Sequence, residues 1–422
     1  MKPHTEAVPH EKYRELIMNY VQDPHKQVGY LQQCLSSDKK PLGLFLGAGC
    51  PMAIRTGGEI GPPLIPDIDG ITQAVRDALS KCEECGPLLS NVDDHFKKDG
   101  HNDANVEEML SHIRALRAVA GNDSVRGLSA ADLEKLDEKI CQTIHELADK
   151  VLPNAETPYH RIASWIDAIV REKPVEIFTT NYDLLMEQAF DDRRVPYFDG
   201  FAGVRKPFFD IRAIEEDMLP PRWARLWKLH GSINWYQVPT KGVFRGTTNE
   251  EGLKRVIHPS HLKYEESRRM PYLAMIDRLR AFLKQPTATL VLCGYSFRDE
   301  HINEVIVQGL QYTQTAIAFA LLFGRMAEYP KASKLARERS NLSLLARDGA
   351  VISSGDAKWL EKDAESVSED AGGWVGWTPI DPANENGKRM AEFHLGDFAT
   401  FGQFLHELIG VARQSSEAPN AK

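Results

Sequence analysis

The chain has 422 residues, a length that suggests two or three domains and allows a sizeable hydrophobic core. Hydrophobic residues make up 42% of it and charged residues 26%, as in ordinary soluble globular proteins. With 51 Lys and Arg against 60 Asp and Glu, the formal net charge is -9. This balance disfavours a protein whose main task is to coat nucleic acid, although it does not exclude a local basic patch.

The sequence also argues against a membrane or secreted protein. No stretch approaches the roughly 18 apolar residues of a membrane helix, and residues 1–12 lack the apolar core of a signal peptide. We therefore predict a cytoplasmic protein, in which the six scattered cysteines are reduced. Cys82 and Cys85 form one C-x-x-C inside a helical pattern, but a zinc site needs four ligands and no second pair exists. We predict helix-face thiols and no zinc.

The first part of the chain predicts a helix, a strand and a glycine turn. Helical spacing of apolar residues covers 11–36, and the apolar run 42–46 has the composition of a buried strand. That strand leads into Gly47-Ala48-Gly49, followed by a loop rich in Gly and Pro over 50–69 and a helix over 70–81. Backbone N–H groups in such a turn can face a pyrophosphate, but a tight turn without a ligand fits the same residues.

Residues 82–150 have a helical and charged pattern with two apolar stripes, separated by a loop over 121–127. We predict a helical insertion beside the sheet. Such stripes usually pack against the protein's own core, although subunits or a partner could also use them.

In the rest of the chain, predicted helices alternate with predicted strands. Predicted helices cover 157–170, 184–190, 267–284, 299–310, 332–347 and 398–411, and predicted strands cover 175–178, 195–198, 226–229, 288–293, 316–323 and 350–353. Residues 199–225 are predicted to be irregular, 233–262 to form loops and short strands, 361–388 to form an acidic surface loop or a partly disordered segment, and residues from 414 to form a polar tail.

Strands that alternate with helices indicate an α/β protein with a Rossmann-like, doubly wound parallel sheet. The predicted domains are the sheet domain over 1–81 and 151–355, the helical insertion over 82–150, and a C-terminal extension of loop and helix over 356–422.

His230 is the first candidate for chemistry, because it follows the apolar run 226–229 and precedes Gly231. Open α/β sheets bind ligands at the carboxyl ends of their strands, and an imidazole there can accept a proton. By itself, a histidine at a strand end is more often a hydrogen-bonded core residue than a catalytic one.

Five motifs at predicted strand ends make a more specific pattern. In chain order they are Gly47-Ala48-Gly49, Ile65-Pro66-Asp67, Thr180-Asn181-Tyr182-Asp183, Leu229-His230-Gly231-Ser232 and Gly294-Tyr295-Ser296. The series resembles the sirtuin family, which binds NAD⁺ in a Rossmann-like domain and whose motifs run GAG-x-S, GIPDFR, TQNID, LHG and G-T/S-S. The resemblance covers about residues 40–325.

The resemblance implies a role for each matching position. Gly47, Ala48 and Gly49 would line the diphosphate, Asn181 would hold the nicotinamide ribose or a water, and His230 would be the catalytic base. Asp67 would line the nicotinamide pocket, Asp183 would order the Asn181 loop, and Gly294 and Ser296 would meet the adenosine side. The resemblance also implies that NAD⁺ is contacted by Thr180, Gly231, Ser232 and Tyr295.

The sequence also departs from the sirtuin deacetylases. Pro51 replaces the serine of their first motif, Ile68-Asp69 replaces Phe-Arg, and Thr180 replaces Gln. No Cys occurs between Ser232 and Leu292, where the deacetylases place a four-Cys zinc module. The pattern therefore resembles the zinc-less bacterial sirtuin-like proteins of antiphage defence, which share the phrases T-T-N-Y-D, K-L-H-G-S and G-Y-S-F-x-D-x-H-I.

That resemblance implies an NAD⁺ glycohydrolase, with NAD⁺ as substrate and nicotinamide and ADP-ribose as products. The long loop before Asp67 resembles that of proteins encoded beside a HerA-like ATPase, which implies a homo-oligomer and an ATPase partner. Two alternatives are an NAD- or ADP-ribose-binding scaffold without hydrolysis and a nuclease or protein-modifying sirtuin. A role for nucleic acid stays undecided.

Overall fold

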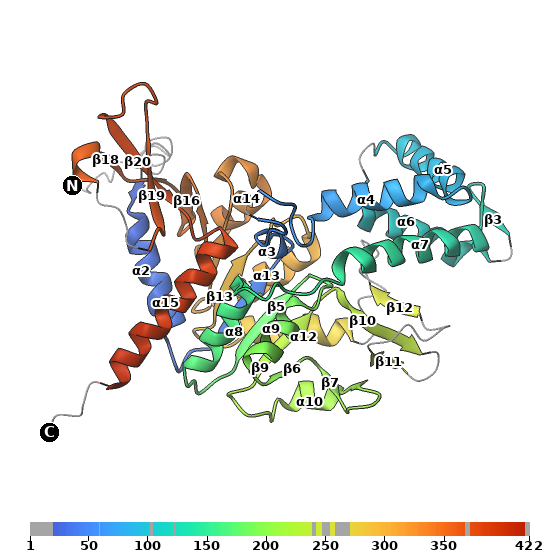
Figure 1. Cartoon of the computed structure of the whole chain (residues 1–422), viewed down its shortest axis with the longest axis horizontal. Helices are drawn as coiled ribbons and strands as arrows, with labels where there is room; N and C mark the ends of the chain where they lie inside the picture. The colour runs from blue at the N-terminus through green and yellow to red at the C-terminus, as the bar shows by residue number, and fades with distance from the viewer. Residues whose placement is uncertain are drawn as a thin grey trace, which may run out of the picture. The chain divides into compact units, whose positions relative to one another are not determined.

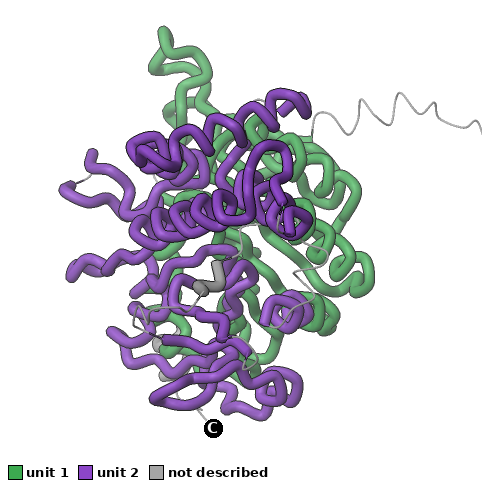
Figure 2. The backbone as a smooth tube through the Cα atoms, turned by 90° about the vertical axis from the view of Figure 1, so that its right-hand side faces the viewer, with its two compact units in different colours: residues 1–47, 161–176, 279–422 green, residues 48–160, 177–278 purple. Residues whose placement is uncertain are grey.

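The computed structural model describes residues 20–58, 60–101, 104–121, 123–238, 242–246, 254–257, 271–367 and 372–417. These residues form two compact units (Figure 2). Unit 1 comprises residues 1–47, 161–176 and 279–422, and unit 2 comprises residues 48–160 and 177–278. The division passes through strand β5 (Val175–Thr179) and through helices α8 (Pro158–Ala168) and α12 (Tyr272–Leu283).

Unit 1 contains a seven-strand portion of sheet in the order β1-β17-β16-β15-β14-β13-β2. Its strands are β1 (Tyr20–Gln22), β2 (Leu42–Leu46), β13 (Thr289–Cys293), β14 (Ile317–Leu321), β15 (Leu342–Ala346), β16 (Gly349–Ile352) and β17 (Gly355–Trp359). β2, β13, β14 and β15 pair in parallel, whereas β16 is antiparallel to both of its neighbours. All residues of β2 and β13 are buried, as expected for parallel strands covered on both faces.

The helices of unit 1 are α2 (Pro24–Leu35), α13 (Glu300–Tyr312), α14 (Pro330–Glu338) and α15 (Phe398–Glu417), with the 3-10 turns η1 (Met326–Glu328) and η2 (Ala364–Ser366). A small antiparallel sheet in the order β18-β20-β19 consists of β18 (Glu361–Asp363), β19 (Val375–Pro379) and β20 (Lys388–Phe393). The α-helices and the strands named in this paragraph carry labels in Figure 1.

Unit 2 contains strands β5, β9 (Ala224–Lys228) and β6 (Tyr197–Phe198), in that order across the sheet, and helix α9 (Leu185–Arg193). A second, antiparallel sheet has the order β12-β10-β11-β8-β7. Its strands are β7 (Phe201–Ala202), β8 (Phe208–Phe209), β10 (Gly231–Val238), β11 (Gly242–Arg245) and β12 (Lys254–Ile257). The short helices α3 (Gly49–Met52) and α10 (Ile211–Glu216) complete this part.

Four helices of unit 2 pack around a core of their own: α4 (Ile68–Lys81), α5 (Cys85–Lys98), α6 (Val106–Ala120) and α7 (Ala130–Ala148). Their apolar stripes are buried, and a small hairpin of β3 (Ser124–Val125) and β4 (Leu128–Ser129) joins α6 to α7. Asn105 and Ser129 begin α6 and α7 with capping boxes, in which side chains satisfy the first helical N–H groups.

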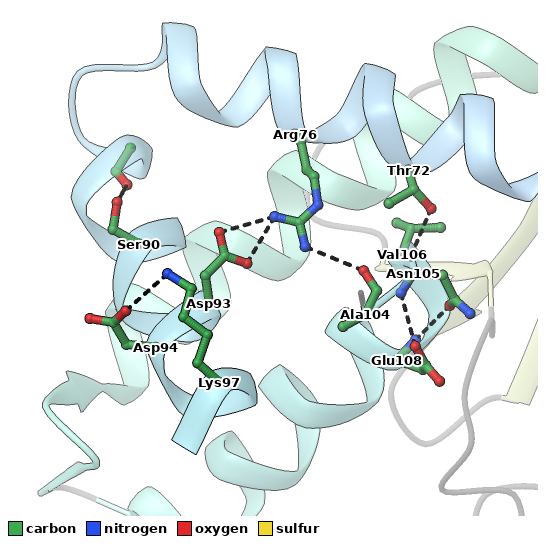
Figure 3. Close-up of polar contacts among 11 residues, drawn as sticks. Thr72, Arg76, Ser90, Asp93, Asp94, Lys97, Ala104, Asn105, Val106 and Glu108 are labelled. Atoms are coloured by element: carbon green, nitrogen blue, oxygen red, sulfur yellow. Dashed lines mark hydrogen bonds and ion pairs between the residues drawn. The ribbon is translucent and has the colours of Figure 1, made fainter. Parts of the chain in front are cut away.

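Arg76 connects three of these helices (Figure 3). One of its terminal nitrogens contacts both carboxylate oxygens of Asp93 on α5, at 2.8 and 3.0 Å, and the other donates to the carbonyl of Ala104 just before α6, at 3.3 Å. Because the two terminal nitrogens have partners on different segments, the guanidinium links α4 to α5 and to the residue just before α6.

The predicted fold class, an α/β Rossmann-like fold with a mainly parallel sheet, is confirmed. The predicted strands at 42–46, 175–178 and 288–293 are present as β2, β5 and β13. Among the described residues no helix is long and apolar enough to cross a membrane.

Several predicted elements were wrong. The helix predicted over 332–347 ends at Glu338, and Leu342–Ala346 forms β15, because a short apolar run fits a buried strand as well as a helix. The loop predicted over 361–388 contains β18 and β19, and α15 continues through the predicted tail to Glu417. The strand at 350–353 is not the last, since β17 pairs with it.

Three further differences concern helix starts and loops. Within the predicted helix 11–36, residues 11–19 lie outside the described residues, residues 20–22 form β1, and α2 begins only at Pro24 after the cap Asp23. The predicted irregular segment 199–225 contains β7, β8 and α10. Of the helix predicted over 267–284, residues 267–270 lie outside the described part, and α12 starts at Tyr272.

Candidate functional site

Two chain reversals lie at the ends of neighbouring strands in unit 2. β5 ends at Thr179 and β9 ends at Lys228, and the two strands are adjacent in the sheet. Beyond the strands, the N–H of Leu229 donates to the carbonyl of Thr179 at 2.8 Å, and the N–H of Ile233 donates to the carbonyl of Tyr182 at 3.0 Å. The segment 180–184 and the turn at 229–230 therefore lie side by side.

Asn181 and His230 lie in these two segments, and both are half-buried. The backbone N–H of Asn181 donates to the Thr179 hydroxyl at 3.0 Å, which shapes the start of the segment. The Tyr182 ring is stacked near the His230 ring, with 6.5 Å between centroids and 30° between planes. Gly231 has φ +89°, a conformation that glycine adopts without strain, and it turns the chain from β9 into β10 immediately after His230.

Lys228, the last residue of β9, contacts segment 180–184 and the start of β10. Its place in the sequence predicted only the end of a strand. It is 2% exposed, and its ammonium donates to the carbonyl of Asp183 and to the Ser232 hydroxyl, the latter at 3.0 Å. It also pairs with the Glu187 carboxylate of α9 at 2.7 Å. One buried cation therefore links the Asn181 segment, the start of β10 and α9.

Two buried carboxyl groups face this lysine. Burial raises the pKa of Asp183 and the pKa of Glu187, and the nearby Lys228 opposes both shifts. Asp183 also accepts the N–H of Leu185 at 3.0 Å, at the start of α9. Because Glu187 has a second oxygen that is buried without a hydrogen-bond partner, the cluster depends on the Lys228 charge.

The four-helix part also contacts the Asn181 segment. The Tyr182 hydroxyl donates to Glu107 of α6 at 3.1 Å, and Tyr182 packs against the apolar core of the four helices. This contact holds the ring that is stacked near His230. The position of segment 180–184 is therefore coupled to the position of α6.

Among the other predicted residues of unit 2, Ser232 and Asp67 have side chains that hydrogen-bond within the protein. Ser232 is fully buried, and its hydroxyl contacts Lys228 and the carbonyl of Tyr182. Asp67 caps α4 by accepting the N–H of Gly70 at 2.9 Å. Thr180 is half-buried, and Ala48 and Gly49 lie at the start of α3.

In unit 1 the structure brings Gly47 and Gly294 together at the aligned ends of β2 and β13. The N–H of Gly47 donates to the carbonyl of Cys293 at 2.9 Å. A Cβ at Gly47 would lie 2.3 Å from the carbonyl oxygen of Gly294 and 2.8 Å from Cα of Tyr295. Glycine at 47 is therefore required by the close approach of the two strand ends.

Tyr295 and Ser296 differ in what they can offer a ligand. The Tyr295 ring packs 4.8 Å from Phe45 and 4.8 Å from Phe297, and its hydroxyl donates to Asn303 at 2.8 Å. Its side chain therefore belongs to the core, which leaves its backbone for binding. Ser296 is exposed.

The described residues hold no group of three or more His, Cys, Asp or Glu side chains that could bind a metal ion. A hollow in unit 2 is lined by residues 151–156, His160, Gln188 and 191–193, with a volume of about 520 Å³. No predicted site residue lines it.

Within unit 1 two glycines stand at strand ends, and within unit 2 an amide and an imidazole do, in an α/β protein with a mainly parallel sheet. Open parallel sheets commonly bind ligands at such strand ends. Residues 175–344, less than half of the chain, match the family model described as the SIR2-like domain, so this region is similar to that domain. The matched region includes Asn181, His230 and Gly294, while Gly47 precedes it. No curated protein gives a significant match to the chain.

Several solved structures resemble the chain at low identity. A Sir2 homologue in complex with NAD is 12% identical, with a TM-score of 0.37, and the match covers 94% of this chain and 96% of that one. A serine-to-alanine mutant of a Sir2 homologue in complex with ADP-ribose is also 12% identical, with a TM-score of 0.37 and coverage of 92% and 98%. A third solved structure, which concerns the mechanism and regulation of Sir2 enzymes, is 12% identical, with a TM-score of 0.35 and coverage of 72% of this chain and 88% of that one.

Proposed function

We propose that the protein is an NAD⁺ glycohydrolase that cleaves the bond between nicotinamide and ribose. The observation that carries the proposal is the pairing of segment 180–184 with the turn at 229–230, which places an amide and an imidazole at adjacent strand ends. An amide can orient a ribose through hydrogen bonds, and an imidazole can accept a proton.

The proposed reaction needs one water and no covalent intermediate. The bond between C1′ of the ribose and the nicotinamide nitrogen breaks, and neutral nicotinamide leaves with the bonding electrons. A water oxygen bonds to C1′ of the oxocarbenium-like species, and His230 accepts the proton from that water. The products are nicotinamide and ADP-ribose.

Each candidate residue has one role in this scheme. The Asn181 amide orients the ribose or the attacking water, and His230 acts as the base. Gly47, Ala48 and Gly49 contact the diphosphate through their backbone, and Gly294 and Ser296 contact the adenosine side. Lys228 acts on the reaction only through the positions of segments 180–184 and 229–230.

We further propose that the hydrolase acts in antiphage defence in the cytoplasm, where loss of NAD⁺ stops an infected cell. An unrestrained hydrolase would poison its own cell, so the resting state must be nearly inactive. We propose that restraint comes from a homo-oligomer and from a HerA-like ATPase partner. Light scattering gives the oligomeric state, and a pull-down with the neighbouring gene product tests the partner; a fully active monomer would refute this part.

The central experiment measures nicotinamide and ADP-ribose after incubation of the full chain with NAD⁺, with and without the neighbouring gene product. We expect His230→Ala to lose about 10²–10⁴-fold in turnover, the usual effect of removing a general base. Asn181→Ala should lose turnover while still binding NAD⁺.

Two matched variants control for nonspecific effects. His101→Ala changes an exposed histidine outside the candidate site, and Asn154→Ala changes an exposed asparagine. Both should keep the turnover of the unmodified chain. Tight NAD⁺ or ADP-ribose binding without turnover in any preparation would favour the scaffold alternative over hydrolysis.

A further inference from the structure

Cys82 and Cys85 meet at the break between two helices, and not inside one helix as the sequence pattern predicted. Cys82 follows the last residue of α4, and Cys85 is the first residue of α5. Their sulfur atoms lie 2.7 Å apart, and the N–H of Cys85 points to the Cys82 sulfur at 3.3 Å. A disulfide bond is about 2.0 Å long, so a shift of less than about 1 Å would join the two sulfurs.

The helices around the pair are held in place independently of it. One terminal nitrogen of Arg76 on α4 contacts both carboxylate oxygens of Asp93 on α5, as Figure 3 shows. Lys135 of α7 pairs with Glu84 in the turn between the two cysteines. The short distance between the sulfurs is therefore a property of the packed helices.

The two thiols have different environments. Cys85 is 2% exposed within the four-helix core, and burial together with the neighbouring Cys82 raises its pKa to about 11. Cys82 is partly exposed, and hydrogen bonds from the thiol and the backbone N–H of Cys85 lower its pKa. This arrangement sets a partly exposed thiol of lowered pKa, just after the end of α4, beside a buried second thiol at the start of α5.

A third cysteine of the same unit provides a contrast. The Cys141 sulfur accepts a hydrogen bond from Arg114 at 3.3 Å, and burial raises the pKa of its thiol to about 12. It therefore lacks the accessible thiolate that exchange chemistry needs.

We propose that Cys82 and Cys85 form a redox-active dithiol site, which low-molecular-weight disulfides such as glutathione disulfide oxidise reversibly to an intramolecular disulfide. The site is independent of the proposed NAD⁺ hydrolysis. Its substrate class is a small disulfide, with Cys82 as the attacking residue and Cys85 as the resolving residue.

The exchange has two balanced steps. The Cys82 thiolate attacks one sulfur of glutathione disulfide, the bond between the two glutathione sulfurs breaks, and one glutathione thiolate leaves. The Cys85 thiol then loses its proton to solvent and attacks the Cys82 sulfur, which releases the second glutathione thiolate. The protein loses two electrons and the small disulfide gains them.

Mass spectrometry of the full chain tests the proposal directly. Trypsin cuts after Lys81 and Lys97, so one peptide holds both cysteines. After reduction, treatment with glutathione disulfide and acid quenching, we expect that peptide to have lost two hydrogens, and dithiothreitol should restore them.

Variants then separate the two roles. Cys85→Ser should trap one glutathione on Cys82, and Cys82→Ser should slow glutathione addition at Cys85 by at least about 10-fold. Cys141→Ser should react like the unmodified chain. Circular dichroism confirms that each variant is folded, and the experiment on the unmodified chain needs no variant.

Three results would overturn the proposal: both thiols staying reduced under glutathione disulfide, equal modification of Cys82 and Cys141, or a bound metal that Cys82→Ser releases. The experiment measures the mass of the peptide that holds Cys82 and Cys85. Its result therefore does not depend on whether the protein hydrolyses NAD⁺.

Discussion

Replacing Lys228 with methionine should destabilise the protein strongly and disable the proposed reaction. Methionine keeps the length of the side chain but removes the ammonium that contacts Asp183, Ser232 and Glu187. Both carboxyl groups are buried, and removing one partner from a buried ion pair typically costs about 3–5 kcal/mol. We expect Lys228→Met to lose that much free energy of unfolding in urea titrations.

The stability deficit of Lys228→Met should depend on pH in a defined direction. Burial already raises the pKa of Glu187 and of Asp183, and Lys228 opposes both shifts, so its loss raises both pKa values further. A carboxyl group with a raised folded-state pKa contributes stability that is present below its unfolded pKa and is lost as the pH rises through the folded value. The deficit of Lys228→Met should therefore be smaller at about pH 5 than at about pH 8.

A double variant tests the cause. Lys228→Met with Glu187→Leu replaces the ion pair by apolar groups and should regain about half of the lost stability, because no Glu187 charge is left unpaired. Lys331→Met, which removes an exposed lysine paired with exposed Glu300, should stay close to the unmodified chain. A deficit that is equal at both pH values, or is not reduced in the double variant, would refute the reasoning.

Three other predictions concern the close approach at Gly47, the hydrogen bond between Tyr182 and Glu107, and metal binding. Gly47→Ala should cost about 1–3 kcal/mol in thermal unfolding, because its Cβ would meet the carbonyl of Gly294, whereas Gly29→Ala, with no atom within 4 Å of its Cβ, should not. Tyr182→Phe removes the hydrogen bond to Glu107 and should cost about 0.5–1.5 kcal/mol while lowering NAD⁺ turnover; unchanged turnover would separate α6 from the proposed site. Metal chelation should leave turnover and unfolding unchanged, and stoichiometric zinc in the purified protein would contradict this.

Much of the sheet could be predicted from the sequence, because its central strands are short apolar runs that glycines end. Leu42–Leu46 and Thr289–Cys293 are examples, and each is buried along its whole length. The position of His230 was predictable for the same reason, and that of Asn181 because it follows the short apolar run of β5. Helices α6 and α7 combine an apolar stripe with a capping residue, which fixes both type and start.

Other elements were not predictable from local pattern. Leu342–Ala346 was assigned to a helix, and only its pairing with β14 makes it a strand. The acidic segment 361–388 has little apolar character, and its strands form because β20 pairs with both β18 and β19. Pairing supplies hydrogen bonds between residues distant in sequence, which spacing within one segment does not reveal.

For the candidate site, the sequence by itself determined which residue types stand at the strand ends: glycines, an amide and an imidazole. Only the tertiary structure decided which side chains face inward. Lys228 and Ser232 are polar residues of an ordinary-looking segment, yet the packing of α9 and β10 encloses both. The reason is physical: a buried charge is stable only where several distant segments supply partners for it, and those partners come together only in the folded chain.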